Sequence, residues 1–288
     1  MNNYAPLIER AFTLNPAAQS YTIEEIEGRA PAFLRGTYFL NGPARFEYNG
    51  FKYRHWPDGD GMVCALCLDH EGIRFTNRFT RSNKFVAEEE AGQPLFRTFG
   101  TAFEGDQLKR SIMLESPVNV SVYPCFGRLL AFGEQGLPWE LDPLTLETRG
   151  PFTFGGAINE VTPFSAHPKF DRGEMVNFGV AGFWMLGISA RRRGRKFFDQ
   201  LVYCDWNEKE ASSVYQAAAC CYLGGEPILI ADPNREDTGV VICQVFDARH
   251  GTGAFAIFDA FDVGRGPVAT LYLKEPVHLG FRASFMRA

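Results

Sequence analysis

Short apolar runs separated by turn-forming residues recur along almost the whole chain, and this pattern most limits the folds that the sequence can adopt. Helical periodicity is confined to two short segments, 83–91 and 212–220. Many short strands with frequent turns are typical of β-sandwiches, barrels and propellers, so we predict an all-β fold. The expected strands are 36–41, 62–68, 73–79, 119–122, 128–132, 175–178, 183–188, 201–204, 227–230, 239–246, 253–259 and 268–273.

Length, charge and cysteine content limit the classes of protein further. The chain has 288 residues, a formal net charge of −5 and seven cysteines. The length suits one large β domain, and the acidic balance argues against a partner that is nucleic acid. The cysteines are irregularly spaced and predict no disulfide framework, and neither an apolar leader nor a membrane-spanning run is evident. We therefore expect reduced thiols and a cytoplasmic location.

One basic run, RRRGRK at 191–196, lies between two apolar stretches. A solvated hairpin turn is the preferred interpretation of such a run. A contact with anionic lipid or with a phosphorylated substrate is the alternative.

The chain contains four ordered blocks, FLRGTYFLNGP at 33–43, HWPDGDGM at 55–62, GRLLAFGE at 127–134 and GGEP at 224–227. Together they resemble the carotenoid cleavage oxygenase family. The resemblance covers roughly residues 25–180 and 222–285. It implies a β-propeller, which in this family has seven blades around a non-haem iron(II) held by four histidines. That iron activates dioxygen to cleave an alkene bond in a carotenoid, apocarotenoid or stilbene, although one branch isomerises and hydrolyses a retinyl ester.

The chain is shorter than this family pattern. After Trp206 it runs almost directly into the GGEP segment, where the family has further blades. We therefore expect a single propeller domain over residues 1–288, with an internal deletion around 207–222 and about five blades.

The residues that the resemblance implies for the iron site are only partly present. His167 matches the first ligand histidine, and Glu134 and Glu226 match glutamates that orient the ligands. Arg282 stands where the family has its last ligand histidine, and the two middle ligands have no counterpart. A guanidinium is always charged and has no lone pair for a cation, so we expect no metal cofactor.

From these residues we predict a metal-independent enzyme of the kind found in secondary metabolism. Glu134, His167, Glu226 and Arg282 would form an acid/base set that isomerises, cyclises or dehydrates an apolar polyene, terpenoid or polyketide-like substrate. The structural alternative makes His167 a core histidine and the three charged residues a buried salt-bridge network in the old iron cavity.

Two other functions stay open on the sequence. An iron(II)-dependent alkene-cleaving dioxygenase would need a remodelled site, with His167 and His278 as ligands beside Glu134 or Glu226. A non-catalytic binder of an apolar ligand, or an inactive regulator of a full-length relative, is the third possibility. Members of the family often dock on membranes through an apolar patch, so peripheral membrane contact is a further expectation; the sequence leaves the oligomeric state open.

The acidic turn Asp58-Gly59-Asp60-Gly61 is similar in composition to a calcium-binding loop. It lacks the remaining ligands of an EF-hand, so a structural turn is the preferred interpretation.

Overall fold

The structure is a computed structural model of the chain in which strands dominate. It describes residues 9–110, 114–160, 162, 164–171, 174–177, 198–203, 213–235 and 238–288. Within them, strands are joined by turns, three short 3-10 segments and one α-helix, which confirms the predicted all-β class. The expected strand 183–188 and the basic run 191–196 lie outside the described residues, as does part of the expected deletion around 207–222.

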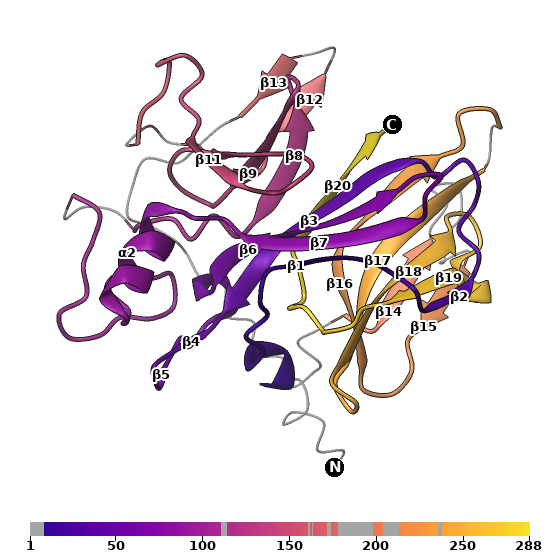
Figure 1. Cartoon of the computed structure of the whole chain (residues 1–288), viewed down its shortest axis with the longest axis horizontal. Coiled ribbons are helices and arrows are strands. Elements are labelled where there is room, and N and C mark those ends of the chain that lie inside the picture. The colour runs from indigo at the N-terminus through magenta and orange to yellow at the C-terminus, as the bar shows by residue number, and fades with distance from the viewer. Residues whose placement is uncertain are drawn as a thin grey trace.

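The first sheet combines N-terminal strands with the last strand of the chain. Its order is β1-β7-β6-β3-β20, all antiparallel, so the last strand pairs with an early one (Figure 1). Arg282 lies opposite Asn41 in this pairing. The strands are β1 (Gln19–Thr22), β3 (Gly36–Arg45), β6 (Asp60–Leu68), β7 (Ile73–Phe79) and β20 (Arg282–Arg287).

Two further sheets and three hairpins complete the described strands. The second sheet has the order β16-β17-β18-β19-β2, and the third has the order β11-β10-β9-β8. The second comprises β2 (Ile26–Gly28), β16 (Cys221–Ala231), β17 (Gly239–Asp247), β18 (Thr252–Asp259) and β19 (Pro267–Tyr272). The third comprises β8 (Ser121–Cys125), β9 (Arg128–Phe132), β10 (Trp139–Leu141) and β11 (Thr148–Pro151). The hairpins are β4 (Glu47–Tyr48) with β5 (Phe51–Lys52), β12 (Lys169–Asp171) with β13 (Glu174–Val176), and β14 (Gln200–Tyr203) with β15 (Ser213–Gln216).

The first sheet is buried on both faces, which explains the nearly continuous apolar run of β3. Side chains alternate across a strand, so Tyr38 and Leu40 face one way and Phe39 the other. Tyr38 and Leu40 belong to a core cluster with Phe255 of the second sheet. Phe39 belongs to a cluster with Val122 of the third sheet. The first sheet is therefore packed between the other two, as Figure 1 shows.

One of the two predicted helices is present. Residues 83–91 form α2 (Asn83–Ala91), whose N-terminus is capped by the Ser82 hydroxyl, 3.2 Å from the Phe85 amide. The helix ends at Gly92 in the left-handed conformation. The prediction of a helix over 212–220 is wrong, because residues 213–216 pair with β14. Partly buried and exposed residues alternate along β15, which is the period of a strand.

The carboxylates of Asp58 and Asp60 in the acidic turn both bond to other segments of the chain. Asp58 accepts hydrogen bonds from Gly100 N and Thr101 Oγ1, at 2.7 and 2.5 Å. Asp60 pairs with Lys84 Nζ at 2.9 Å and with Arg45 at 2.8 Å. These bonds favour the structural interpretation of the turn over the calcium loop.

Candidate functional site

His167 and Glu134 lie together at the edge of the third sheet. Glu134 follows β9, and its Oε1 is 2.9 Å from His167 Nε2. The Glu134 side chain is 51% exposed, and the His167 side chain is 33% exposed. An ionised carboxylate only accepts hydrogen bonds, so Nε2 is the donor in a bond to it. The pair thus presents an imidazole that is oriented by the Glu134 carboxylate.

The backbone before His167 is held from two sides. Ser121 Oγ donates to the Ala166 carbonyl at 2.7 Å. Asn177 accepts from Ser165 N at 3.0 Å and donates to its carbonyl at 2.8 Å. These bonds fix the approach of His167 to Glu134.

Arg282 and Glu226 form a second pair. Arg282 Nη2 is 3.1 Å from Glu226 Oε1, and the side chains are 25% and 57% exposed. Two backbone bonds bring β16 to this point, from Gly225 N to the Gly280 carbonyl and from Glu226 N to the Phe281 carbonyl. Both pairs are partly exposed, so neither is the buried network that the sequence offered as an alternative. In the described part of the chain, no ion pair joins Arg282–Glu226 to His167–Glu134.

Asn41 links the elements that carry the two pairs, and the sequence analysis missed it. Its side chain is fully buried and donates to the carbonyls of Val118 and Ser121, at 3.1 and 2.9 Å. Asn41 is also the register partner of Arg282, while Ser121 holds the residue before His167. An amide inside an otherwise apolar strand was the signal that could have identified it.

A cavity of about 260 Å³ opens beside Glu134. This volume falls somewhat below the roughly 300–1,000 Å³ of most small-molecule pockets. It therefore fits a ligand of modest size or one end of a longer one. The lining residues are Pro57, Thr98, Phe99, Leu114, Glu115, Ser116, Pro117, Asn119, Val120, Glu134 and Gln135.

Glu115 is the second carboxylate of this cavity. Burial raises its pKa, and Lys109 Nζ, 3.2 Å from Glu115 Oε1, opposes that shift. Because Glu115 and Glu134 line the same cavity, the lining combines apolar walls with two carboxylates.

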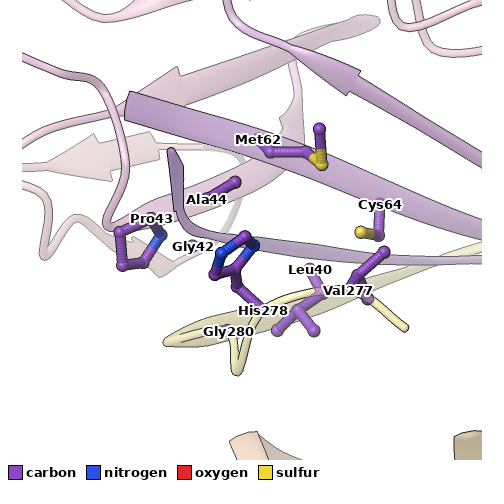
Figure 2. A pocket seen from close by; sticks show the side chains of 9 residues that line it. All are labelled: Leu40, Gly42, Pro43, Ala44, Met62, Cys64, Val277, His278 and Gly280. Carbon is purple, nitrogen blue, oxygen red and sulfur yellow. The ribbon is translucent and has the colours of Figure 1, made fainter. Parts of the chain in front are cut away.

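His278 lies elsewhere, beside a much smaller cavity of about 10 Å³. Figure 2 shows it next to the Leu40–Ala44 segment of β3, with Met62 and Cys64 on β6. It is 6% exposed, and within the described residues neither ring nitrogen makes a hydrogen bond of normal geometry. Burial lowers the pKa of His278 to about 3, although the nearby Leu14 backbone opposes the shift. The ring is therefore neutral at physiological pH.

This buried histidine predicts a loss of stability in mild acid. Between its ordinary pKa of 6.5 and its folded pKa of about 3, only the unfolded chain takes up the proton. Stability is therefore complete above 6.5 and falls as the pH drops, by about 1.4 kcal/mol per unit. Urea unfolding at about pH 7.5 and about pH 5 should show that His278→Leu removes about 2 kcal/mol of the pH dependence.

The exposed His250, paired with Asp247 at 2.7 Å, provides the control. His250→Leu should leave most of the pH dependence in place. An equal pH dependence in wild type and His278→Leu would contradict the assignment.

The chain resembles solved β-propellers over nearly its whole length. A variant of the Synechocystis apocarotenoid oxygenase (ACO) matches with a TM-score of 0.77 and 18% identity, covering 98% of this chain and 99% of that one. A chimera of ACO and RPE65 matches with a TM-score of 0.78 and 18% identity, covering 98% of each chain. The fold thus defines a single-domain protein of the β-propeller class.

The chain belongs to the RPE65 family, described as Retinal pigment epithelial membrane protein, which it matches over residues 13–183 and 181–287. This confirms the resemblance to carotenoid cleavage oxygenases. Within the described part of the chain, no helix has both the length and the apolar character needed to cross a membrane.

Each of three curated relatives matches a little over half of this chain. Apocarotenoid-15,15'-oxygenase of Synechocystis is 36% identical over 166 residues, which cover 56% of this chain and 34% of that protein. Isoeugenol monooxygenase of Pseudomonas nitroreducens is 34% identical over 159 residues, covering 54% and 33%. Resveratrol cleavage oxygenase 1 of Aspergillus fumigatus is 34% identical over 157 residues, covering 54% and 31%. The matched part spans about a third of each relative.

These comparisons correct the expectation that no cofactor is bound. The relatives are named oxygenases, and a solved neighbour with a TM-score of 0.74 is a cobalt-substituted Synechocystis ACO. They therefore point to a metal cofactor. They also give no support to non-oxidative isomerisation, cyclisation or dehydration.

The described residues do not by themselves form a complete metal site. Across the described ranges, no three His, Cys, Asp or Glu side chains gather in a way that could hold an ion. His167 is engaged with Glu134, and Arg282 with Glu226. His167 and His278 lie at different places, and in the described residues neither belongs to a group of three such ligands.

Proposed function

We propose that the chain acts as an oxygenase that cleaves the alkene bond of an apolar, conjugated substrate such as an apocarotenoid or a stilbene. In the overall reaction dioxygen gives one oxygen atom to each former alkene carbon, and two carbonyl products form. The cavity beside Glu134, with His167 held against that carboxylate, is the observation that supports the proposal most directly. Family membership and the oxygenase names of the relatives support the reaction type.

The chain's own residues would bind and orient the substrate. Apolar walls such as Leu114 and Val120 would take up the hydrocarbon, because burying apolar surface is favourable. Glu134 would present its carboxylate at the substrate, and His167 would fix the orientation of that carboxylate. A bound metal would supply the activation of dioxygen.

Replacing Glu134 or His167 should abolish most turnover while the fold persists. Positioned acid/base and orienting groups contribute about 100- to 10,000-fold, so we expect at least a 100-fold fall in kcat/KM for Glu134→Gln and His167→Ala. Oxygen uptake and carbonyl products should be measured with resveratrol, isoeugenol and an apocarotenal, using protein made in iron-supplemented medium. Elemental analysis should show near-stoichiometric metal.

His250→Ala is a matched control, because it removes a histidine that also pairs with a carboxylate but lies in an exposed turn. It should leave turnover unchanged. Full activity in Glu134→Gln and His167→Ala would remove these residues from the site. Absence of both metal and oxygen uptake would defeat the oxygenase proposal.

Non-catalytic binding of an apolar ligand is the second candidate. The Arg282–Glu226 pair favours it, since a permanent cation stands where the family resemblance places the last ligand histidine. Ligand binding measured by fluorescence quenching, without products in metal-loaded protein, would favour this candidate over the oxygenase.

A further inference from the structure

Phe99 is an exposed aromatic ring on the wall of the cavity. Its side chain lines the cavity beside Glu134, and the residue is 43% exposed. A large apolar ring that stays partly in water at a cavity gains stability when a ligand covers it. The face of an aromatic ring also prefers a flat, conjugated partner in offset or edge contact.

The turn that carries Phe99 is fixed by a buried carboxylate. Asp58 is fully buried and accepts from Gly100 N at 2.7 Å and from Thr101 Oγ1 at 2.5 Å. Thr101 Oγ1 in turn accepts from Arg54 N at 2.8 Å. The turn closes on itself with a bond of 3.0 Å from Thr98 N to the Thr101 carbonyl. These bonds leave few alternative positions for Phe99, which lies between Thr98 and Gly100.

Close packing holds the turn from the other side. A Cβ at Gly100 would lie 2.2 Å from the Cβ of His55, so only glycine fits there. The His55 ring also contacts the Phe99 ring, with centroids 5.1 Å apart and planes at 57°. Packing against His55 thus holds Phe99 in place, while the ring remains partly exposed in the cavity wall.

We propose that Phe99 selects a planar conjugated ligand over its saturated counterpart, and that Asp58 is the positioning residue that holds the Phe99 turn. This inference rests on the proposed function of the same cavity. It gives the acidic turn at 58–61 a role in ligand selection beyond its structural one. Phe99 acts as a specificity residue, and Asp58 acts through it.

The test compares the affinities of resveratrol and of dihydroresveratrol, which lacks the conjugated alkene. Both dissociation constants are measured by titration calorimetry on the full chain. Wild type should prefer resveratrol, and Phe99→Leu should reduce that preference by roughly 2- to 10-fold, which is the size of one aromatic contact. Leucine keeps most of the apolar area, so a merely hydrophobic wall would leave the ratio unchanged.

Phe126→Leu is the matched control, because Phe126 is a 53% exposed phenylalanine outside the cavity lining. Its affinity ratio should equal that of wild type. Asp58→Asn should shift the affinity ratio in the same direction as Phe99→Leu. In the Phe99→Leu background, adding Asp58→Asn should change the affinity ratio little further. Thr101→Val removes one bond to Asp58 and serves the same purpose if Asp58→Asn folds poorly.

The outcomes separate the two proposals. A wild type that binds and cleaves resveratrol, together with an unchanged ratio in Phe99→Leu, overturns the role of Phe99 alone. A ratio that responds to Phe99→Leu but not to Asp58→Asn or Thr101→Val overturns the positioning role of Asp58. A wild type that binds neither ligand overturns this inference together with the proposed function.

Discussion

Replacing Lys84 with methionine is expected to lower the free energy of unfolding by about 3–5 kcal/mol, the usual cost of breaking a buried ion pair from one side. Lys84 has no exposed side-chain surface, and its Nζ lies 2.9 Å from Asp60 and 2.7 Å from Glu88. The Tyr53 hydroxyl is 3.2 Å away. Methionine would leave the buried Glu88 carboxylate without its cation and the buried Asp60 carboxylate with Arg45 as its remaining cationic partner. Urea unfolding followed by circular dichroism measures the change.

The charge of Lys84 is maintained by its partners. Burial alone would lower the pKa of Lys84, but Asp60, Tyr53 and Glu88 raise it overall, above the ordinary value. The amine therefore stays protonated throughout the range in which the protein is handled. Lys52→Met is the control, because Lys52 is 67% exposed and pairs with Glu47 at 3.4 Å. That exposed pair should contribute about 0–1 kcal/mol, and an equally small effect at Lys84 would contradict the buried network.

Adding a methyl group at Gly61 is the second large effect that we expect. A Cβ there would lie 2.1 Å from the Val118 carbonyl oxygen and 2.8 Å from that of Pro117. Both obstacles are backbone atoms, so a side chain cannot turn aside to make room. Gly61→Ala should therefore lower the free energy of unfolding by about 3 kcal/mol, at the upper end of overpacking effects.

Gly105→Ala separates the clash from the general cost of replacing glycine. No atom lies within 4 Å of a Cβ at Gly105, but its φ is +82°. This substitution should cost only about 1 kcal/mol, from backbone strain. A Gly61→Ala variant no less stable than Gly105→Ala would show that the segment at 117–118 can move away.

Gly61 lies on β6 and Lys84 pairs with Asp60 of β6, so both residues take part in joining the first sheet to the elements packed around it. The Gly61 amide donates to the Pro117 carbonyl at 2.9 Å, which brings the segment before β8 against β6. Pro117, Asn119 and Val120 from that segment line the cavity. Damage at Gly61 should therefore reach the candidate site as well as stability.

Much of the local structure follows from the sequence because its causes are local. Short apolar runs bounded by turn residues predicted β17 and β18, which pair over their length. Helical spacing after Ser82 predicted α2. The family motifs placed Glu134 and His167 in one set with Glu226 and Arg282, and the side chains of the first two are 2.9 Å apart.

Other features depend on contacts between distant parts of the chain. Residues 213–216 form a strand because β14 offers them a hydrogen-bonding edge, which overrides a weak helical spacing. Lys84 is buried because Asp60, 24 residues earlier, and Tyr53, 31 residues earlier, surround its ammonium group. Composition alone would place a helical lysine in water.

The sequence by itself determined the all-β class and the family, because periodicity and motifs depend on residues that are close together in the chain. Only the tertiary structure decided that Phe99 lines a cavity with Glu134 and that Asn41 ties the third sheet to β3. It also divided the four predicted site residues into two pairs, His167 with Glu134 and Arg282 with Glu226. The physical reason is that side chains far apart in sequence meet only after the sheets pack, and burial then fixes which polar groups must find one another.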